Sequence, residues 1–307
     1  QPVTRYLAQR FLQMLGVFLI ISLVVFLLLV LTGDPIELLL PPASDLAQID
    51  AMRRQLGLDR PWYVQYVKFL ASAVRGDLGE SFYFREPAIR LVLERLPASL
   101  ELVVWTMAVS TVVAIPLGVL AATHPRTWLD RLILVGSLVG ISAPTFWIGI
   151  VLIALFVVSL GWLPSSGRGG WEHLVLPVAT LAFYRVALFV RLIRAGMLDV
   201  LGQDYIRTAR AKGLFERLVI YRHALKNTLI PFVTIGGIQM GGLVAFAVVT
   251  ERIFAWPGMG RLLLISIERL DYPVVVAYAI VTAALFVVIN LGVDLLYALI
   301  DPRIRYE

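Results

Sequence analysis

The stretch "YIRTARAKGLFERLVIYRHALKNTLIP", residues 205–231, lies between two long apolar runs and carries six Arg or Lys residues, one Glu and one His. The whole chain of 307 residues is 59% hydrophobic and only 16% charged. Soluble domains carry about 45–50% apolar and about 25% charged residues. The composition therefore predicts an integral membrane protein, in which a charged and patterned loop between two spans needs a specific explanation.

Six segments are long and apolar enough to cross a bilayer, because a spanning helix needs about 20 mostly apolar residues. They are residues 11–32, 101–123, 132–160, 174–198, 228–250 and 273–299. Backbone groups in lipid must hydrogen-bond internally, and these runs are too long and too uniformly apolar for barrel strands. We therefore expect an all-α polytopic membrane protein with six transmembrane helices, folded as a single domain over residues 1–307.

Lys and Arg in short loops set the orientation of such a protein. If the N-terminus is cytoplasmic, the inner segments hold Arg5, Arg10, Arg126, Arg131, the cluster from Arg191 to Lys226, Arg303 and Arg305. The short outer loops then hold only Arg168, Arg252, Arg261 and Arg269. This asymmetry accounts for the net charge of +6. It predicts that both termini and the loop over residues 199–227 lie on the cytoplasmic side. The long segment over residues 33–98 is then extracytoplasmic.

The extracytoplasmic segment has helix signals of its own. "SDLAQIDAMRRQLGLDRP", residues 44–61, predicts a helix capped at Asp45 and ended at Gly57, with Pro61 starting the next helix. In that second helix an aromatic stripe recurs at helical spacing, formed by Trp62, Tyr66, Phe69 and Ala73. Packing of the stripe against the spans is the favoured interpretation, and a position on the membrane surface or a substrate contact is the alternative.

A second outer stretch, "TERIFAWPGMGRLL" at residues 250–263, contains a Pro257-Gly258 turn signal. Phe254 and Trp256 beside it suit the membrane interface. Two interpretations stay open at this stage. The stretch is either an outer gate or docking ledge for another protein, or a re-entrant cap that closes the bundle.

Several kinds of chemistry have no signal in the sequence. It contains no G-x-x-x-x-G-K-[ST] phosphate loop, no H-E-x-x-H, no G-x-S-x-G and no Cys, and its three His residues are far apart. Apart from Glu101 at the very start of the second span, only one carboxylate, Asp294, lies in an expected span, which disfavours proton- or sodium-driven transport. We therefore expect no catalytic residue, no metal and no cofactor in this chain, and a passage that needs an external energy source.

The loop at residues 207–213, "RTARAKG", predicts a short helix that ends at Gly213. Its small side chains are Thr208, Ala209 and Ala211, and small side chains let the surface of another protein come close. The bases around them are Arg207, Arg210 and Lys212, which can pair with acidic groups or with the carbonyl end of a helix.

This arrangement resembles the cytoplasmic EAA loop of ABC importer permeases, with Arg207, Thr208 and Ala209 at the Glu-Ala-Ala positions counted back from Gly213. The Glu, the first Ala, and the later Ile and Pro of that pattern are replaced here. One branch is matched more fully: eight ordered segments resemble the peptide/nickel permease family, in the pattern of dipeptide- and oligopeptide-permease B-type subunits. They are "LGLDRPWYVQY", "GDLGESF", "LPASLEL", "GQDYIRTARAKGL", "RHALKNTLIP", "ERIFAWPGMGRLL", "RLDYPVV" and "VDLLYALIDPRIR".

The resemblance implies the type I ABC importer permease fold and a defined set of partners. These are a second homologous permease subunit, two ATP-binding subunits on the cytoplasmic side that hold ATP and Mg²⁺, and an extracytoplasmic substrate-binding protein. No nucleic acid is implied, and the location is the bacterial inner membrane. The residues implied to contact an ATPase subunit are Tyr205, Arg207, Thr208, Ala209, Arg210, Ala211, Lys212, Gly213 and Leu214.

Arg185 stands about a third to halfway along the fourth span, where a charge costs about 2.5–3.5 kcal/mol on insertion scales. It either faces the conduit or a partner subunit, which we favour, or snorkels toward the interface. Other residues that can line the conduit are Tyr184, Thr234, Gln239, Gly237 and Gly241. The two glycines equally suit close helix packing.

The expected solutes are dipeptides, oligopeptides or similar small solutes. A nickel, glutathione, opine or sugar importer of the same family is the alternative. Two other classes are disfavoured: a membrane enzyme would need clustered His, Asp or Glu near one interface, and a stand-alone channel would leave the patterned loop without a purpose.

Overall fold

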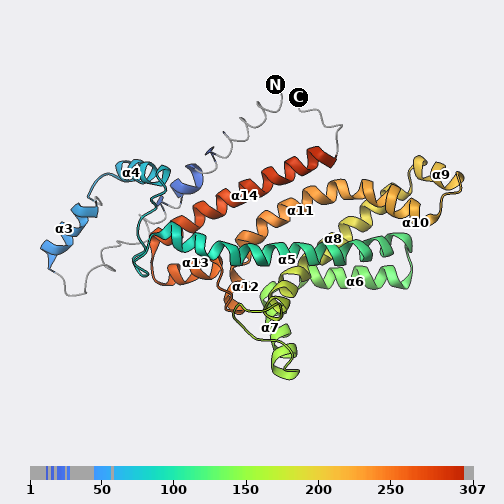
Figure 1. Ribbon diagram of the computed structural model, residues 1–307, viewed down its shortest axis with the longest axis horizontal. Helices are drawn as coiled ribbons and strands as arrows, with labels where there is room; N and C mark the ends of the chain where they lie inside the picture. Colours follow the sequence, from blue (N-terminus) through green and yellow to red (C-terminus); the bar gives the residue numbers. More distant parts are fainter. Residues whose placement is uncertain are drawn as a thin grey trace. The chain divides into compact units, whose positions relative to one another are not determined.

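The computed structural model describes residues 12, 15–16, 19–24, 26–27, 45–56 and 59–300. The described chain is helical and contains no strand, only an isolated bridge between Glu80 and Pro87. This confirms the expected all-α class. It falls into two compact units: one combines Gln1–Ala98 and Gly258–Val287 with the last two residues, and the other combines Ser99–Pro257 and Val288–Arg305. Each unit is described by itself below, and Figure 1 labels the helices.

The unit beginning at Ser99 holds most of the expected spans. Its elements in chain order are α5 (Ala88–Thr123, which starts in the other unit), α6 (Trp128–Ser142), α7 (Thr145–Leu152), η1 (Ile153–Ser159), α8 (Glu172–Leu201), α9 (Asp204–Ala211), α10 (Glu216–Leu218), η2 (Val219–Leu225), α11 (Lys226–Phe246) and α12 (Val248–Ile253). The other unit holds α3 (Leu46–Leu56), α4 (Trp62–Val74) and α13 (Met259–Glu268), and α14 (Tyr272–Ile300) begins in it.

Three helices in the described chain are long and apolar enough to span a membrane: Ala88–Thr123, Glu172–Leu201 and Tyr272–Val293. Two bent pairs raise that number to five if each pair forms one span. The pairs are Trp128–Ser142 with Thr145–Ser159, bent by 104°, and Glu216–Leu229 with Pro231–Phe246, bent by 50°. The expected first span, 11–32, lies largely outside the described residues, so the count of six stays a prediction.

Two expected spans differ from the structure in shape. Pro144 interrupts the third span, because proline lacks the N–H that a continuous helix would use there, and α6 ends just before it. Pro116, by contrast, lies within an uninterrupted α5. That helix starts at Ala88 rather than near residue 101, so residues 88–98 of the expected extracytoplasmic segment are its first three turns.

The helix α4 packs against helical residues near the N-terminus, as the favoured interpretation of its aromatic stripe requires. The Tyr66 hydroxyl donates to the Leu19 carbonyl at 3.1 Å, and the rings of Tyr66 and Phe69 lie 5.4 and 6.2 Å from the ring of Phe26. Trp62, in contrast, is half-exposed. The stripe is therefore a packing face at Tyr66 and Phe69.

In the same unit, Asp271 joins two of the segments that carry the family resemblance. Its buried carboxylate accepts hydrogen bonds from the Ser81 hydroxyl and from the backbone N–H groups of Phe82 and Tyr83. "GDLGESF" and "RLDYPVV" are thus held together by one anion, although about 190 residues separate them.

Phe254 and Trp256 are buried inside their own unit rather than exposed on its surface. Both are only 1% exposed. The Phe254 carbonyl accepts from Gly167 N at 2.8 Å, and the guanidinium of Arg168, which pairs with Glu101, lies over the Trp256 ring. These contacts favour the interpretation as a re-entrant cap, because the aromatic rings close the interior of their own unit.

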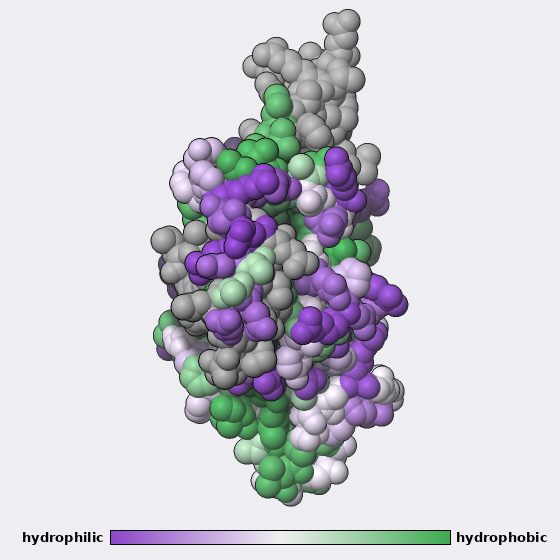
Figure 2. Space-filling model, turned by 90° about the vertical axis from the view of Figure 1, so that its left-hand side faces the viewer, coloured by the Kyte–Doolittle hydropathy of each residue, from purple (hydrophilic) through white to green (hydrophobic). Residues whose placement is uncertain are grey.

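The segment α7–η1 has an apolar surface. Its exposed large side chains include Phe146, Trp147, Ile150 and Val158. Figure 2 shows this end as a green surface at the bottom of the view. An exposed face of this kind is stable where the surrounding solvent is hydrocarbon, as in a membrane span.

The helix α8 is the centre of its unit, because small residues let three neighbours come close to it. A Cβ on Gly118 of α5 would lie 2.8 Å from the side chain of Ile193, and one on Gly140 of α6 would lie 2.6 Å from Ala187 Cβ. On α8 itself, a Cβ at Gly196 would lie 2.8 Å from Thr228 in the first turn of α11. Without these glycines the helices would have to move apart.

This packing predicts opposite outcomes for two glycines of the same helix. We expect Gly140→Val to destabilise the protein by about 1–3 kcal/mol, since the new side chain overlaps Ala187. Gly136→Val is the control, because a Cβ there meets nothing within 4 Å. The melting temperature of the purified protein in detergent measures both, and equal melting temperatures for the two variants would contradict the packing at Gly140.

Candidate functional site

The helix α9, residues Asp204–Ala211, forms within the patterned loop. Asp204 stands in its first turn and Arg210 in its last, which places each charge at the end of the helix dipole that favours it. The helix has a strongly one-sided pattern, with Ile206 and Ala209 buried and the residues between them exposed. It is therefore a short amphipathic helix anchored to the protein on one side only.

Gly213 ends this helix in a left-handed conformation, with φ of +77°. Its N–H donates to the Arg210 carbonyl at 2.9 Å, and the N–H of Leu214 donates to the Ala209 carbonyl at 3.4 Å. This pair of bonds is the Schellman motif, in which glycine is favoured because a side chain would be strained at positive φ. The structure confirms the predicted helix end at Gly213.

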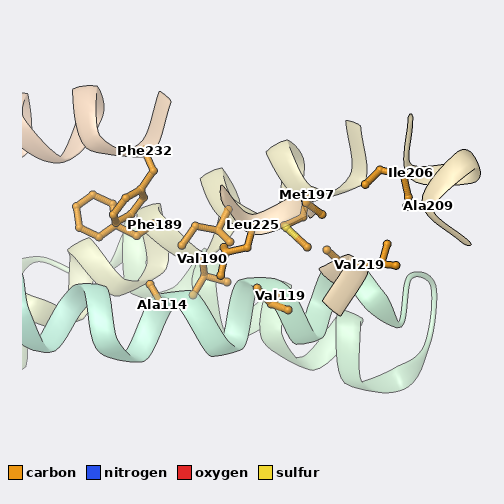
Figure 3. Close-up of a cluster of buried hydrophobic side chains, with 13 residues drawn as sticks. Ala114, Val119, Phe189, Val190, Met197, Ile206, Ala209, Val219, Leu225 and Phe232 are labelled. Carbon is orange, nitrogen blue, oxygen red and sulfur yellow. The ribbon is translucent and has the colours of Figure 1, made fainter. Parts of the chain in front are cut away.

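The buried face of α9 belongs to a continuous apolar cluster. The cluster comprises Ala114, Val119, Ala122, Phe189, Val190, Ile193, Met197, Ile206, Ala209, Val219, Ala224, Leu225 and Phe232. Figure 3 shows it running from the Phe189–Phe232 pair, whose ring centres lie 4.9 Å apart, to Ile206 and Ala209 on α9. The helix is thus packed into the same core as α5, α8 and η2.

This packing separates the small residues that sequence analysis grouped together. Ala209 is 8% exposed and faces the core of its own chain, whereas Thr208 and Ala211 are exposed. The exposed surface of the helix and its C-terminal end includes Asp204, Tyr205, Arg207, Thr208, Arg210, Ala211, Lys212 and Gly213. Leu214 is partly buried and packs against the cluster.

Phe215 is a part of this surface that sequence analysis did not identify. It directly follows the helix end and is 86% exposed. Tyr221, also exposed, follows six residues later. The sequence did contain a signal for these two residues. They are large apolar side chains in a charged loop that is expected to lie in water, and apolar side chains exposed to water mark contact surfaces.

Two polar contacts hold α9 to the chain that follows it. Arg210 makes a two-pronged ion pair with Glu216, with N–O distances of 2.7 and 3.1 Å, and this hydrogen bonding raises the pKa of Arg210. The pair is exposed, so it contributes less than about 1 kcal/mol. The Tyr205 hydroxyl accepts from Asn227 Nδ2 at 2.8 Å, which links α9 to α11.

The chain re-enters the bundle through η2, a π-helix over Val219–Leu225. Val219, Ala224 and Leu225 are buried in it and belong to the cluster that holds α9. Wide helical turns of this kind are uncommon and occur frequently at functional sites. The position of η2 between α9 and α11 makes it the connection between the loop and the fifth span.

A second ion pair lies toward the C-terminal end of α8, the end that leads into α9. Arg194 donates to both carboxylate oxygens of Asp130 at 2.6 and 2.8 Å, and Arg126 N donates to the same carboxylate at 2.9 Å. Asp130 is 3% exposed, so the start of α6 is fixed to α8 by a mostly buried charge pair. Sequence analysis had counted Arg194 as a positive-inside charge, and the lone acid between Arg126 and Arg131 was the signal for its partner.

Arg185 is 7% exposed in the middle of α8. Within the described residues its hydrogen bond is from Nη1 to the Leu181 carbonyl, 2.9 Å away, and its buried Nε has no partner. Tyr184 beside it is partly buried. A buried guanidinium with an unused donor requires a further acceptor, because an unsatisfied buried charge is strongly unfavourable.

The α11 residues expected in the conduit are dispersed. Gly237 lies against Val293 of α14, where any Cβ would overlap that side chain, so close helix packing explains it. Gly241 is buried, Gln239 is partly buried and Thr234 is exposed. In the described part of the chain no hydrogen bond joins Arg185 or Tyr184 to any of these, and no group of His, Cys, Asp or Glu is placed to hold a metal ion.

Comparison with known families and structures bears on this arrangement. The family model described as "Binding-protein-dependent transport system inner membrane component" matches residues 114–306, and "Binding-prot-dependent transport system membrane comp, N-term" matches residues 3–103. "Glutathione transport system permease protein GsiC" of Escherichia coli strain K12 is 42% identical over 303 residues, which is 98% of this chain and 99% of the relative. The protein of the same name from Shigella boydii serotype 4 is 41% identical over the same shares.

Two solved structures share the fold. "Inward facing conformations of the MetNI methionine ABC transporter" has a TM-score of 0.58 and 18% identity, covering 69% of this chain and 96% of that one. "Crystal structure of an amino acid ABC transporter with histidines" has a TM-score of 0.52 and 16% identity, covering 70% and 94%. At these identities the likeness concerns the fold alone.

The end of α9 gives a prediction that separates backbone geometry from side-chain chemistry. We expect Gly213→Val to weaken α9 by about 1–2 kcal/mol, since left-handed backbone is unfavourable for a side chain with a Cβ. Hydrogen exchange of the α9 amides should then quicken about tenfold. Gly213→Asn is the control, because Asn tolerates this conformation, and unchanged exchange in the Val variant would contradict the assigned helix end.

Proposed function

Because the chain belongs to the family of binding-protein-dependent transport system inner membrane components, we propose that it carries short peptides, of the size of glutathione, across the inner membrane. The chain is a permease subunit of an ABC importer and has the type I importer permease fold. The observation that supports the solute class is 42% identity over nearly the full chain to permeases named for glutathione transport. Glutathione is a tripeptide, so it falls within the expected peptide class.

A permease of this family works with ATPase and binding-protein partners. For this chain we infer a second homologous permease, two ATP-binding subunits at the cytoplasmic loop and a binding protein at the outer face. ATP, Mg²⁺ and hydrolysis are assigned to those ATP-binding subunits, and this chain is assigned no catalytic step. The predicted orientation, with both termini cytoplasmic, follows from the loop charges.

The exposed face of α9 is proposed as the contact for an ATP-binding subunit. Its small residues Thr208 and Ala211 permit close approach, and Arg207 and Lys212 present positive charge to an acidic groove. Phe215 adds an exposed aromatic side chain next to the helix end. Aromatic and Arg side chains are enriched among the residues that carry most of the energy of protein contacts.

The buried face of α9 supports a lever mechanism for coupling. Ile206 is fully buried in the cluster that includes Met197 of α8 and Leu225 of η2. Packed cores deform little, so a push on α9 is transmitted as a rigid-body shift into α8 and α11 rather than absorbed locally. Hydrolysis in a partner would in this way change the access of the conduit from one side of the membrane to the other.

The assignment of residues to the conduit is also a proposal. Arg185 is assigned to it because a buried guanidinium with an unused Nε–H can donate to a carboxylate, either of a solute or of the second permease. Tyr184, Thr234 and Gln239 are assigned weaker polar contacts. Gly237 and Gly241 are assigned to helix packing that keeps the conduit wall smooth.

Uptake by the assembled importer tests the solute class. The chain is reconstituted in proteoliposomes with its partner permease, ATP-binding subunits and binding protein, and ATP-dependent uptake of labelled glutathione, a dipeptide and a nickel chelate is compared. We expect peptide uptake at least tenfold above that of the nickel chelate. Equal or greater uptake of the nickel chelate, or of an opine or sugar, would replace the peptide assignment with the corresponding alternative.

Arg185 can be tested in the same system. We expect Arg185→Met to lower peptide uptake at least tenfold while the complex still co-purifies, because the only guanidinium in the middle of α8 is lost. Arg185→Lys keeps the charge and should retain part of the uptake. Normal uptake by the Met variant would remove Arg185 from the conduit.

A further inference from the structure

Four residues near the C-terminal end of α8 connect this helix to four other elements. Ile193 lies against a glycine of α5, and Gly196 lies against the first turn of α11. Met197 belongs to the apolar cluster that also holds α9. Arg194 lies in the same turn and forms the ion pair with Asp130 of α6. This turn is therefore the junction at which α5, α6, α9 and α11 are joined to α8.

The ion pair at this junction is directional. Arg194 donates from two nitrogen atoms, Nε and Nη2, to the two carboxylate oxygens of Asp130 at 2.6 and 2.8 Å. A two-pronged pair of this kind fixes orientation as well as distance. The side chain of Asp130 is only 4% exposed and that of Arg194 is 21% exposed, so water competes little for either charge.

Asp130 is also bound into the start of its own helix. Thr127 caps α6 by accepting from Asp130 N at 3.3 Å, and the Asp130 carboxylate in turn accepts from Arg126 N at 2.9 Å. This reciprocal arrangement resembles a capping box, which fixes the first turn of a helix. A displacement of Arg194 that carries the carboxylate along must therefore carry the first turn of α6 as well.

Packing between α6 and α8 is close further along the two helices and incomplete near the start of α6. Gly140 lies against Ala187 of α8, where a Cβ would overlap that side chain. Nearer to the start of α6, a Cβ at Gly136 would meet nothing within 4 Å, and a groove runs along Ile133 and Val190. The ion pair thus holds the end of α6 at which the packed side chains leave open space.

We propose that the Asp130–Arg194 pair is a positioning contact for transport, which makes α6 move with α8 when an ATP-binding subunit displaces α9. This role rests on the lever of the proposed function, which involves α8 and α11, and it adds the third expected span to the moving body. Neither residue of the pair handles the solute. Since α6 ends at the break before Pro144, its displacement is delivered to the bend of that span.

Transport and ATP hydrolysis measured together test this role. The assembled importer is reconstituted as above, and uptake of labelled glutathione, or of the solute that replaces it, is divided by the ATP hydrolysed. We expect Arg194→Met to lower this ratio at least fivefold while ATP hydrolysis stays within twofold of the unmodified importer, because α6 no longer follows α8. A contact that only stabilises the fold would lower both rates together, in proportion to the complex recovered.

Two further variants of α8 are matched to this one. Arg194→Lys keeps a cation that can donate to one carboxylate oxygen, so we expect it to retain at least half of the ratio. Arg191→Met makes the same change at an exposed arginine of the same helix and should leave the ratio unchanged.

A double variant keeps the test valid if a single variant folds poorly. Arg194→Met leaves the Asp130 carboxylate buried without its partner, which is strongly unfavourable. Asp130→Asn combined with Arg194→Met leaves no such charge, and the Asn side chain can still accept from Arg126 N. Because both residues serve one contact, we expect the double variant to lose no more of the ratio than either single variant.

Three results would overturn the proposal. Proportional losses of uptake, ATP hydrolysis and recovered complex would make the pair a structural contact only. Losses that multiply in the double variant would show that the two residues act separately. The third result is a normal ratio for Arg194→Met, and Ile206→Ala, which loosens α9 in the core, then locates the failure. A lowered ratio for Ile206→Ala removes only α6 from the moving body, and a normal one removes the lever as well.

Discussion

The close approach of α8 to its neighbours is the constraint on which the rest of this unit depends. Gly118, Gly140 and Gly196 remove the side chains that would hold α5, α6 and the start of α11 away from it. In lipid there is little hydrophobic driving force between helices, so such contacts rely on van der Waals packing. The cluster that holds α9 forms on the same helix, because Ile193 and Met197, on either side of Gly196, belong to it.

Charge is placed on this scaffold in three different ways. Asp130 and Arg194 neutralise each other where α6 begins. Arg210 and Glu216 do so in the exposed loop, where the pair contributes little to stability and mainly orders the chain after α9. Arg185 is the exception, since its buried Nε has no acceptor in the described chain. A charge in that position calls for an acceptor beyond the described residues, which fits the proposed conduit of an importer.

Much of the fold and of the candidate site could be predicted from the sequence. The predictions that failed did so for physical reasons. Long apolar runs predicted the helical class, and Gly213 predicted the helix end because left-handed backbone favours glycine. Sequence could not show that Ala209 faces inward, since the burial of α9 depends on how it docks against Val219 and Met197. Phe254 and Trp256 looked suited to an interface, and only the contact with Gly167 and Arg168 shows that they are buried.

The central claim is that α9 and α8 move as one body when the partners hydrolyse ATP. Spin labels at Asp204→Cys on α9 and Ala195→Cys on α8, in a chain that has no other cysteine, report their separation by pulsed electron paramagnetic resonance. The assembled importer is measured without nucleotide and with trapped ATP. The account predicts the same distance distribution in both states, since Ile206 and Ala209 stay packed in the core. A shift between the states would show that α9 moves independently and would contradict the lever.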